Sequence, residues 1–391
     1  MKLTGLETLF GSGGYSASAE SLVAYSRDAS TIQGECIAVV WPSETDQIVK
    51  LVEWACEHEI DLVPRGAGTG LCGGAIPMRS VVVDFSRLTA IGAVDQVNQH
   101  ISVQAGVVLD HLNRSLSPTN LYLPVIPGSH QSATIGGMIA TNAAGLRSVR
   151  YGSMRRWVEE ITLVDGQGNK KTLSEISLDG VIGREGTTGF ITEAVVRLTP
   201  VHHEHSLSLR KFTNHQALLR QQAQWAAEDR LTALEYINRH AAQSMGWEPD
   251  LYLLAEFEDG SGDIIDPSQV SDMWRKRDGL YPMLARNGYP MIEDPQIGQE
   301  SLGGILDWLD NIRVPVFGHL GVGILHPCFP PDDDRVGILY QRIADVGGKV
   351  SGEHGIGLKK KIWMDASLQS EIRQLKAVHD PHNVINRGKL C

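Results

Sequence analysis

The order of hydrophobic and polar positions predicts alternating strands and helices in the first two hundred residues. Ile37-Ala38-Val39-Val40 is an unbroken apolar run, which is typical of a buried strand, and apolar residues at 48, 51, 52 and 55 recur with a helical period. Residues 43–46 have the spacing of a capping box, so we expect that helix to begin there. The remaining patterns predict strands entering Pro64 and at 81–85, an extended segment at 101–103, a helix at 107–116, and a hairpin formed by 161–164 with the turn 165–169.

The pattern changes near residue 202. Segments 213–229 and 267–287 have helical composition, and they alternate with apolar runs such as 251–254. No internal repeat or low-complexity tract interrupts the chain. Mixed helices and strands on both sides of this change predict an α+β fold divided into two domains.

Composition narrows the class of protein. The 391 residues are 42% hydrophobic and 21% charged, which is enough apolar material for two or three packed domains. A net charge of −11 argues against nucleic acid or an anionic membrane as the main partner, because both select clustered Lys and Arg.

Two further features bear on location and redox chemistry. No apolar run approaches the ~20 residues that span a bilayer, and the N-terminus lacks a signal-peptide core, so we expect a cytoplasmic protein without a transmembrane segment; peripheral membrane association stays open. The five cysteines include no C-x-x-C pair, so we expect neither a disulfide framework nor a protein-held iron–sulfur cluster.

Glycine, with 41 residues, is the unusual component, and it gathers in a few segments. The first, 66–74, follows a predicted strand, and successive glycines there would let backbone N–H groups converge on an anion such as a pyrophosphate. The Rossmann pattern is only loosely met because Gly73, Gly74 and Pro77 break the helix that it requires, and the P-loop Lys is absent. From these residues alone, a phosphate cradle and a structural glycine turn both remain open.

Two more glycine-rich segments complete a recognisable series. Small residues dominate 127–145, as a large flat ligand lying against backbone would require, and 183–193 begins Gly183-Arg184-Glu185-Gly186. The three segments, in this order and spacing, resemble the FAD-binding domain of the vanillyl-alcohol oxidase superfamily. The branch they resemble contains D-lactate dehydrogenases, glycolate oxidase catalytic subunits and D-2-hydroxyglutarate dehydrogenases.

The resemblance extends from about 30 to 390 and implies a domain plan. The fold class is α+β, with a PCMH-type FAD-binding domain of two α+β subdomains and a C-terminal α+β substrate (cap) domain. The implied parts are an N-terminal segment 1–31, the FAD domain 32–201, the cap domain 202–355, and a segment 356–391 that returns to the FAD domain.

The resemblance also implies the residues that contact FAD. Backbone from Arg65 to Leu71 would hold the pyrophosphate, and Asn386, in a tail similar to the closing motif of these proteins, would return to the flavin ring. The implied set is Arg65, Gly66, Ala67, Gly68, Thr69, Gly70, Leu71, Pro127, Gly128, Ser129, Thr134, Gly136, Gly137, Ala140, Thr141, Asn142, Asn386 and, near the adenosine half, Glu185, Gly186 and Ile191. Because the first loop lacks the His that tethers flavin in some relatives, we expect non-covalent FAD.

The last third of the chain holds a histidine and glutamate group. His319 and His326 are seven residues apart with glycines between them, and they can meet on one divalent cation if a carboxylate joins. An isolated pair of this kind is more often two loop histidines. The resemblance implies a site for Zn²⁺ or another divalent metal formed by His319, His326 and Glu353, with His354 as the catalytic base.

The same region departs from the family pattern. Val322 and Ile324 stand where relatives have Asp and Asn, which predicts lost hydrogen bonds around the metal ligands. Arg277 ends a Trp-x-x-Arg element that resembles a substrate-carboxylate contact; a solvated helix face is the alternative. We expect the lysines at 359–361 to form a solvated face, with Lys360 reaching an anion as the alternative. The stretch 295–300 lacks the basic residue that a second substrate carboxylate would need, which favours a small monocarboxylate.

The resemblance therefore implies FAD-dependent oxidation of a small D-2-hydroxy acid, such as D-lactate or glycolate, to the 2-oxo acid. The alternatives are a D-2-hydroxyglutarate-type dehydrogenase, a zinc-dependent hydrolase and a non-catalytic FAD-binding subunit. With no second redox centre in the chain, the electron acceptor is external: a quinone, an electron-transfer flavoprotein, an iron–sulfur subunit, a cytochrome or oxygen. A homodimer is compatible with the sequence, which does not specify the oligomeric state.

Overall fold

Two separate cores organise the chain, and the structure, a computed structural model, describes residues 3–390. The first unit contains the described residues up to Ala143, then Ser153–Val201 and the chain from His354 onward; the second contains Ala144–Gly152 and His202–Glu353. Cys391 and the first two residues of the expected N-terminal segment lie outside the described part. The expected division into an FAD domain, 32–201, and a cap domain, 202–355, stays a prediction.

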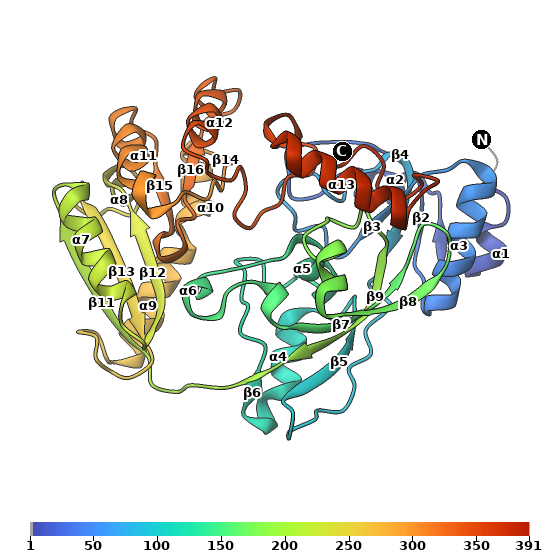
Figure 1. Ribbon diagram of the computed structural model, residues 1–391, viewed down its shortest axis with the longest axis horizontal. Helices are drawn as coiled ribbons and strands as arrows, with labels where there is room; N and C mark the ends of the chain where they lie inside the picture. The colour runs from blue at the N-terminus through green and yellow to red at the C-terminus, as the bar shows by residue number, and fades with distance from the viewer. Residues whose placement is uncertain (1–2, 391) are drawn as a thin grey trace. The chain divides into compact units, whose positions relative to one another are not determined.

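The first sheet of the first unit has the order β1-β2-β4-β3, with β4 pairing in parallel to both β2 and β3 (Figure 1). Val39 and Val82 of this sheet pack against Leu22 and Tyr25 of α2, so the N-terminal segment is part of the core. Its elements are α1 (Leu6–Phe10), β1 (Tyr15–Ser16), α2 (Ala19–Tyr25), β2 (Glu35–Val40), α3 (Thr45–His58), β3 (Leu62–Arg65) and β4 (Met78–Asp84).

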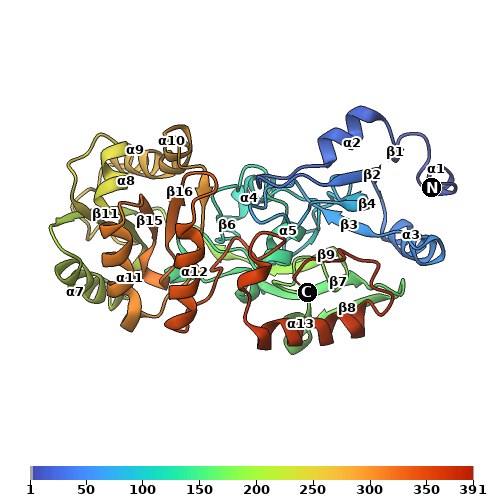
Figure 2. The same cartoon turned by 90° about the horizontal axis from the view of Figure 1, so that it is seen from above.

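The second sheet of this unit is antiparallel, in the order β5-β9-β7-β8, and contains the expected β7–β8 hairpin. Helix α13 lies beside it, because the N–H of Gly166 in the hairpin turn donates to His379 O (Figure 2). Its strands are β5 (His100–Gln104), β7 (Val158–Val164), β8 (Lys170–Ser174) and β9 (Phe190–Arg197), while β6 (Leu121–Tyr122) and β10 (Thr199–Pro200) pair as a separate two-stranded antiparallel sheet. The other elements of this part of the unit are α4 (Leu109–Leu116), α5 (Ile135–Thr141), α13 (Ala366–His379) and the 3₁₀ turns η1 (Ser117–Thr119), η2 (Met154–Arg156), η3 (Glu175–Gly180) and η5 (Lys361–Trp363).

One local prediction is wrong. Helix α3 buries its four expected apolar positions, but Glu44 rather than Ser43 is the N-cap and its side chain caps nothing. Ser43 instead donates to Gln47 Oε1 through its backbone N–H at 2.8 Å. The glutamine side chain therefore satisfies the serine N–H that precedes the helix, and the expected capping box does not form.

The second unit is built on one sheet in the order β11-β13-β12-β15-β16-β14. Every residue of β12 and β13 is buried, as expected of strands covered on both faces. Figure 2 shows α9 and α10 on one side of this sheet and α7, α11 and α12 on the other. Its elements are α6 (Ser148–Tyr151), β11 (Ser206–Phe212), α7 (His215–Ala226), β12 (Leu231–Ile237), α8 (Arg239–Ser244), β13 (Leu251–Phe257), α9 (Pro267–Asp278), α10 (Leu280–Arg286), β14 (Met291–Ile292), α11 (Gln299–Asn311), β15 (Val316–His319), η4 (Leu320–Val322), β16 (His326–Phe329) and α12 (Arg335–Asp345).

The helical segments differ from expectation mainly at their ends. Asn214 caps α7, which begins two residues later than the composition indicated. The segment 267–287 forms two helices, because Gly279 ends α9 and precedes α10. Arg277 therefore lies in the last turn of α9 rather than in the middle of one long helix. No helix within residues 3–390 combines the length and the apolar character needed to cross a membrane.

A buried ion pair fastens residues 144–152 to the second unit. Arg147 contacts Glu256 on β13 through two nitrogens, at 2.6 and 2.9 Å, and Glu256 is completely buried. Thr232 Oγ1 and Trp274 Nε1 also donate to this carboxylate, at 2.7 and 3.0 Å. Arg147 thus balances the charge of Glu256, and three side chains donate hydrogen bonds to its oxygens, as burial of a carboxylate requires.

Replacing Arg147 with Met should therefore destabilise the second unit by about 3 kcal/mol, because the buried Glu256 loses its cation. Arg150, which lies on the same segment and has a side chain 43% exposed, pairs with Glu258 and supplies a matched control. Arg150→Met should cost about 1 kcal/mol or less. Urea unfolding followed by circular dichroism measures both, and equal losses for the two variants would contradict the assignment.

Candidate functional site

The first glycine-rich loop begins where β3 ends, and Arg65 anchors its start. The guanidinium donates to Arg27 O at 2.7 Å and lies over the ring of Tyr25, 5.2 Å from its centre. Tyr25 in turn donates its hydroxyl to Asp84 at 2.8 Å, and burial together with Asp84 raises the pKa of Tyr25 to about 12. The phenol therefore stays a donor, and the N-terminal segment holds the loop in place.

The backbone N–H groups of this loop are available to a ligand. Within residues 3–390, the N–H groups of residues 66–71 donate to no protein acceptor. Consecutive unsatisfied donors on a glycine-rich loop form an anion nest, and buried or half-buried donors need a partner. The loop thus fits a pyrophosphate, and the phosphate cradle is favoured over a purely structural glycine turn.

The glycines of the first two segments are of two kinds. A Cβ added at Gly66 would lie 2.2 Å from Thr134 Oγ1, and one at Gly136 would lie 2.6 Å from the Cβ of Ala105, so these glycines are required by contacts within the chain. A Cβ at Gly70 or Gly128 would meet no protein atom within 4 Å. Open space at these two positions leaves room for a ligand, whereas the first pair has no room for a side chain because the chain itself lies there.

The start of α5 offers no free donors to an anion. Thr134 caps the helix and accepts from Gly137 N, while the N–H groups of Ile135 and Gly136 donate to Val107 O and Ala105 O. Any contact between this segment and a cofactor is therefore made by side chains and by close approach rather than by the helix N-terminus.

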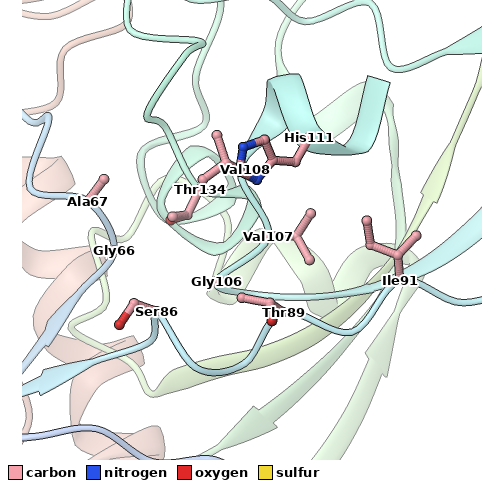
Figure 3. Close-up of a pocket in the computed structure, with 10 residues that line it drawn as sticks. All are labelled: Gly66, Ala67, Ser86, Thr89, Ile91, Gly106, Val107, Val108, His111 and Thr134. Carbon is pink, nitrogen blue, oxygen red and sulfur yellow. The ribbon is translucent and has the colours of Figure 1, made fainter. Parts of the chain in front are cut away.

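A cavity of about 470 Å³ lies beside both segments. Figure 3 shows Gly66 and Ala67 of the loop on one wall and Val107 and His111, at the start of α4, on another, with Thr134 between them. Two glycine-rich segments that are far apart in the chain thus line one space, as a cofactor site formed by both would require.

The third segment joins the C-terminal tail to the first loop. The Glu185 carboxylate accepts from the N–H groups of Ile356 and Gly357, at 2.6 and 2.9 Å, and burial raises the pKa of Glu185. Asn386 Nδ2 donates to Gly74 O and to Glu185 O, at 3.1 and 2.8 Å. The tail therefore packs on the glycine loop inside the first unit.

This packing corrects one expectation. Lys360 is 1% exposed, not solvated, and its charge acts on the buried Glu185. Lys389 is also buried, and desolvation lowers the pKa of Lys389 to about 8 although Glu185 opposes the shift. Lys389 Nζ donates to Gly74 O at 3.2 Å, so one positive charge of the tail lies at the end of the glycine-rich loop.

In the second unit, His319, His326 and Glu353 come together. One ligand atom from each lies within 4.8 Å of the others, and the two imidazole rings are perpendicular with centres 5.2 Å apart. His319 Nε2 is 3.5 Å and His326 Nε2 is 3.2 Å from the same oxygen, Oε1 of Glu353. Two imidazole nitrogens and one carboxylate are the ligand types of a catalytic zinc site.

Strand pairing and one acidic side chain produce this convergence. β15 ends at His319 and pairs with β16, which begins at His326, and the short connection passes through Gly323 at φ +70°. Asp294 Oδ2 accepts from Ser351 Oγ and from the N–H groups of Gly352 and Glu353, at 2.8 to 3.0 Å. The turn that carries Glu353 is therefore held by a single carboxylate.

Each imidazole also has an acceptor on its second nitrogen. Oε1 of Glu235 lies 2.6 Å from His319 Nδ1, and Glu293 O lies 3.3 Å from His326 Nδ1. Burial would lower the pKa of His319, but the carboxylates of Glu235 and Glu353 outweigh it and raise that pKa to about 9. A cation bound by the Nε2 atoms would replace the proton there, so the residues fit a divalent metal.

The departures at 322 and 324 do not remove these acceptors. Ile324 is 2% exposed, and a Cβ added at Gly352 would lie 2.5 Å from its side chain, so the isoleucine fills space beside the turn that carries Glu353. At 324 a side chain that could hydrogen-bond is replaced by this apolar packing, while Glu235 and the carbonyl of Glu293 are the acceptors of the two rings.

Arg277 lies at the end of α9 and is 11% exposed in its side chain. Its Nε donates to Glu235 Oε2 at 2.7 Å, and its guanidinium lies over the ring of Phe317 at 5.0 Å. It is therefore not on a solvated helix face. Sequence reasoning missed Glu235, although a lone acidic residue within the apolar strand Leu231–Ile237 was a usable signal.

The other predicted site residues lie in the first unit. His354 is the first residue of the C-terminal part of the first unit, directly after Glu353. The predicted FAD residues are all in the first unit: Arg65 at the end of β3, Gly66, Ala67, Gly68, Thr69, Gly70 and Leu71 in the loop, Pro127, Gly128 and Ser129 before α5, Thr134 to Thr141 at its cap and along it, Asn142 at its end, Glu185 and Gly186 before β9, Ile191 on β9, and Asn386 in the tail.

Comparison with known proteins agrees with both halves of this description. Residues 36–174 match the FAD binding domain family, and residues 258–390 match the family of FAD linked oxidases, C-terminal domain. A D-2-hydroxyglutarate dehydrogenase of Xanthomonas citri pv. viticola is 30% identical over 420 residues, which cover 90% of this chain and 89% of the relative.

The chain belongs to the FAD-linked oxidase family. Other relatives are the glycolate oxidase subunit GlcD of Bacillus subtilis, 27% identical over 94% of this chain and 91% of the relative, and a D-lactate dehydrogenase of Anaerostipes hadrus, 28% identical over 90% and 89%. Solved alkyldihydroxyacetonephosphate synthase has the same fold, with a TM-score of 0.69 and 18% identity over 98% of this chain and 84% of that one.

Membership in the FAD-linked oxidase family confirms several predictions. The protein is an FAD-dependent oxidoreductase, and the α+β fold with a PCMH-type FAD domain followed by a second α+β domain is confirmed. The individual cofactor contacts, the metal ligands and the non-covalent attachment of FAD stay predictions.

The open space at Gly70 leads to a test. Gly70→Val should weaken FAD binding by about tenfold or more, because its side chain enters space that faces no protein atom, while the FAD-free protein should keep its stability within about 0.5 kcal/mol. Fluorescence titration with FAD and urea unfolding measure the two effects. Gly304→Val, at an exposed position of α11 that also faces open space, is the control. Unchanged FAD affinity in Gly70→Val would remove the loop from the site.

Proposed function

We propose that this protein oxidises a small D-2-hydroxy acid, such as D-lactate or glycolate, to the 2-oxo acid. The observation that carries the proposal is the convergence of His319, His326 and Glu353 in the second unit of a chain whose first unit belongs to an FAD-binding family. The relatives named D-lactate dehydrogenase, glycolate oxidase subunit and D-2-hydroxyglutarate dehydrogenase are all named for 2-hydroxy acids, which supports the same substrate class.

Each group has a distinct task in the proposed reaction. When bound, FAD supplies the hydride acceptor and a divalent metal, Zn²⁺ or another, supplies a Lewis acid for the substrate oxygens. His319, His326 and Glu353 would hold that metal. His354 would accept the proton of the substrate hydroxyl, as a general base must when the hydride leaves the adjacent carbon.

Recognition of the substrate carboxylate is assigned to Arg277. Glu235 occupies the Nε and Nη2 edge of the guanidinium, whereas Nη1 lies 3.9 Å from Oδ1 of Asp278. Nη1 and the groups around it are therefore the donors that a carboxylate would use. The half-paired guanidinium supports one carboxylate better than two, as does the stretch 295–300, which carries no basic side chain.

Three alternative functions are less well supported. A D-2-hydroxyglutarate-type substrate would need a second cation. Family membership favours a flavin enzyme over a zinc-dependent hydrolase, and an assembled histidine and glutamate cluster favours catalysis over a non-catalytic FAD-binding subunit. We also propose that the electron acceptor is external and that FAD is bound non-covalently. A homodimer and a cytoplasmic location are further proposals.

The substrate class is tested by flavin reduction. Anaerobic mixing of the purified yellow protein with D-lactate, L-lactate, glycolate and D-2-hydroxyglutarate should bleach the flavin absorbance with D-lactate or glycolate. Chelator treatment should slow bleaching by about 100-fold or more, since a lost Lewis acid costs several kcal/mol. Bleaching by D-2-hydroxyglutarate alone would replace the proposed substrate, and bleaching by none would favour the non-catalytic subunit.

The role of His354 has its own test. His354→Ala should keep bound FAD and lose about 100-fold or more in the rate of substrate-driven bleaching, as expected for removal of a general base. His382→Ala, an exposed histidine of the same C-terminal part, is the control and should bleach at the wild-type rate. Unchanged bleaching in His354→Ala would remove this residue from the mechanism.

A further inference from the structure

Glu235 is a buried carboxylate in the middle of an otherwise apolar strand. Its neighbours Leu234 and Tyr236 belong to the large core that includes helices α7, α11 and α12. Because successive side chains of a strand alternate between faces, Glu235 points to the opposite face, where α9 lies. It is fully buried, so its charge must be matched by protein groups.

Both oxygens of this carboxylate are used, each by a residue of the proposed site. β12 pairs with β15 in the register that sets Glu235 directly opposite His319, and Oε1 lies 2.6 Å from Nδ1 of that histidine. Oε2 accepts from Arg277 Nε at 2.7 Å. One side chain therefore joins the proposed metal ligand to the proposed carboxylate-binding residue.

The contact to His319 selects how that ring can bind a metal. Glu235 is buried between the Arg277 guanidinium and Nδ1 of His319, and a carboxylate paired with a guanidinium accepts hydrogen bonds but donates none. Nδ1 of His319 must then carry the hydrogen, which leaves Nε2, on the side of Glu353, as the metal-binding nitrogen. A carboxylate behind a metal-bound imidazole also makes the ring a stronger donor.

The contact to Arg277 has the opposite effect on the carboxylate. A guanidinium on Oε2 draws negative charge away from His319, and it keeps the Glu235 side chain in one rotamer. Arg277 therefore positions the carboxylate while weakening its effect on the imidazole. The two partners compete for one charge, which makes metal affinity dependent on a residue that is not a metal ligand.

We propose that Glu235 is a positioning residue that couples the metal ligand His319 to the substrate-binding residue Arg277. In this arrangement, a substrate carboxylate that engages Arg277 releases charge from Glu235 toward His319 and strengthens the metal site. The inference rests on the proposed function, since it takes the metal and the carboxylate contact from it. Beyond that function, it assigns a role to Glu235 and explains why His319 and Arg277 would act together.

The test uses the full-length protein, freed of metal and titrated with Co²⁺ against a chromophoric chelator. Glu235→Gln should bind Co²⁺ about 10- to 100-fold more weakly, the range found when the partner behind a metal-bound histidine is lost. Its visible Co²⁺ spectrum should also change, because His319 loses its fixed orientation.

Arg277→Met supplies the second variant, and the expected effect has the opposite sign. Removal of the guanidinium leaves the whole Glu235 charge facing His319, so Co²⁺ should bind several-fold more tightly. In the double variant with Glu235→Gln, this gain should shrink, because the carboxylate that transmits it is gone. A merely structural role for Glu235 would make both single variants bind more weakly.

Glu256→Gln is the matched control. Glu256 is equally buried, lies on the neighbouring strand β13 and is also paired with an arginine, but it contacts none of the three proposed ligands. Its replacement should leave Co²⁺ affinity at the wild-type value. Retained FAD and a single thermal unfolding transition well above the titration temperature in Glu235→Gln would show that lost affinity is not lost folding.

Three outcomes would overturn the inference. Wild-type affinity in Glu235→Gln, or weaker binding in Arg277→Met, would remove the coupling while leaving the metal site in place. A wild-type protein that binds no Co²⁺ would overturn the metal site of the proposed function, and the role of Glu235 with it.

Discussion

The cost of burying a carboxylate inside a sheet governs the second unit. A fully covered strand cannot hold an ionised side chain unless cations and donors reach it, so Glu235 and Glu256 each fix the position of the groups around them. Glu256 gathers Arg147, Thr232 and Trp274 and thereby fastens residues 144–152 to the sheet. Glu235 gathers His319 and Arg277, and these are the groups from which a substrate site would be built.

Backbone groups have the corresponding role in the first unit. Most N–H groups near the start of α5 are satisfied by the chain itself, whereas those of residues 66–71 have no acceptor within residues 3–390. The surrounding contacts keep that loop from closing on itself: Arg65 is held by the segment after α2, and Asn386 is bonded to Gly74 O. Consecutive N–H groups without a protein acceptor can bind an anion, and such a site does not require a helix N-terminus.

The replaced residues at 322 and 324 show why a motif and a site are not the same thing. The family pattern places hydrogen-bonding side chains beside the two histidines, and their loss predicts a weakened centre. In the folded chain the acceptors behind the rings come from elsewhere, from the carboxylate of Glu235 on β12 and the carbonyl of Glu293. Ile324 instead packs beside Gly352, so it shapes the turn that carries Glu353. In this chain, a changed motif therefore leaves both imidazoles with an acceptor on Nδ1, because Glu235 and the carbonyl of Glu293 supply it.

Local pattern in the sequence was sufficient for several strands and helices and for the position of the glycine-rich segments, because periodicity and spacing are properties of neighbouring residues. The histidine and glutamate group was implied by the family resemblance instead, since an isolated histidine pair is more often two loop histidines. Local pattern failed at Ser43, where a glutamine side chain took the place of a cap, and at Lys360, whose charged neighbours suggested solvent. Only the tertiary structure decided which glycines face open space, that Arg277 is paired, and that Glu235 belongs with His319. Those facts depend on strand register and on contacts between residues more than forty positions apart, and burial makes such contacts obligatory without marking them in the local sequence.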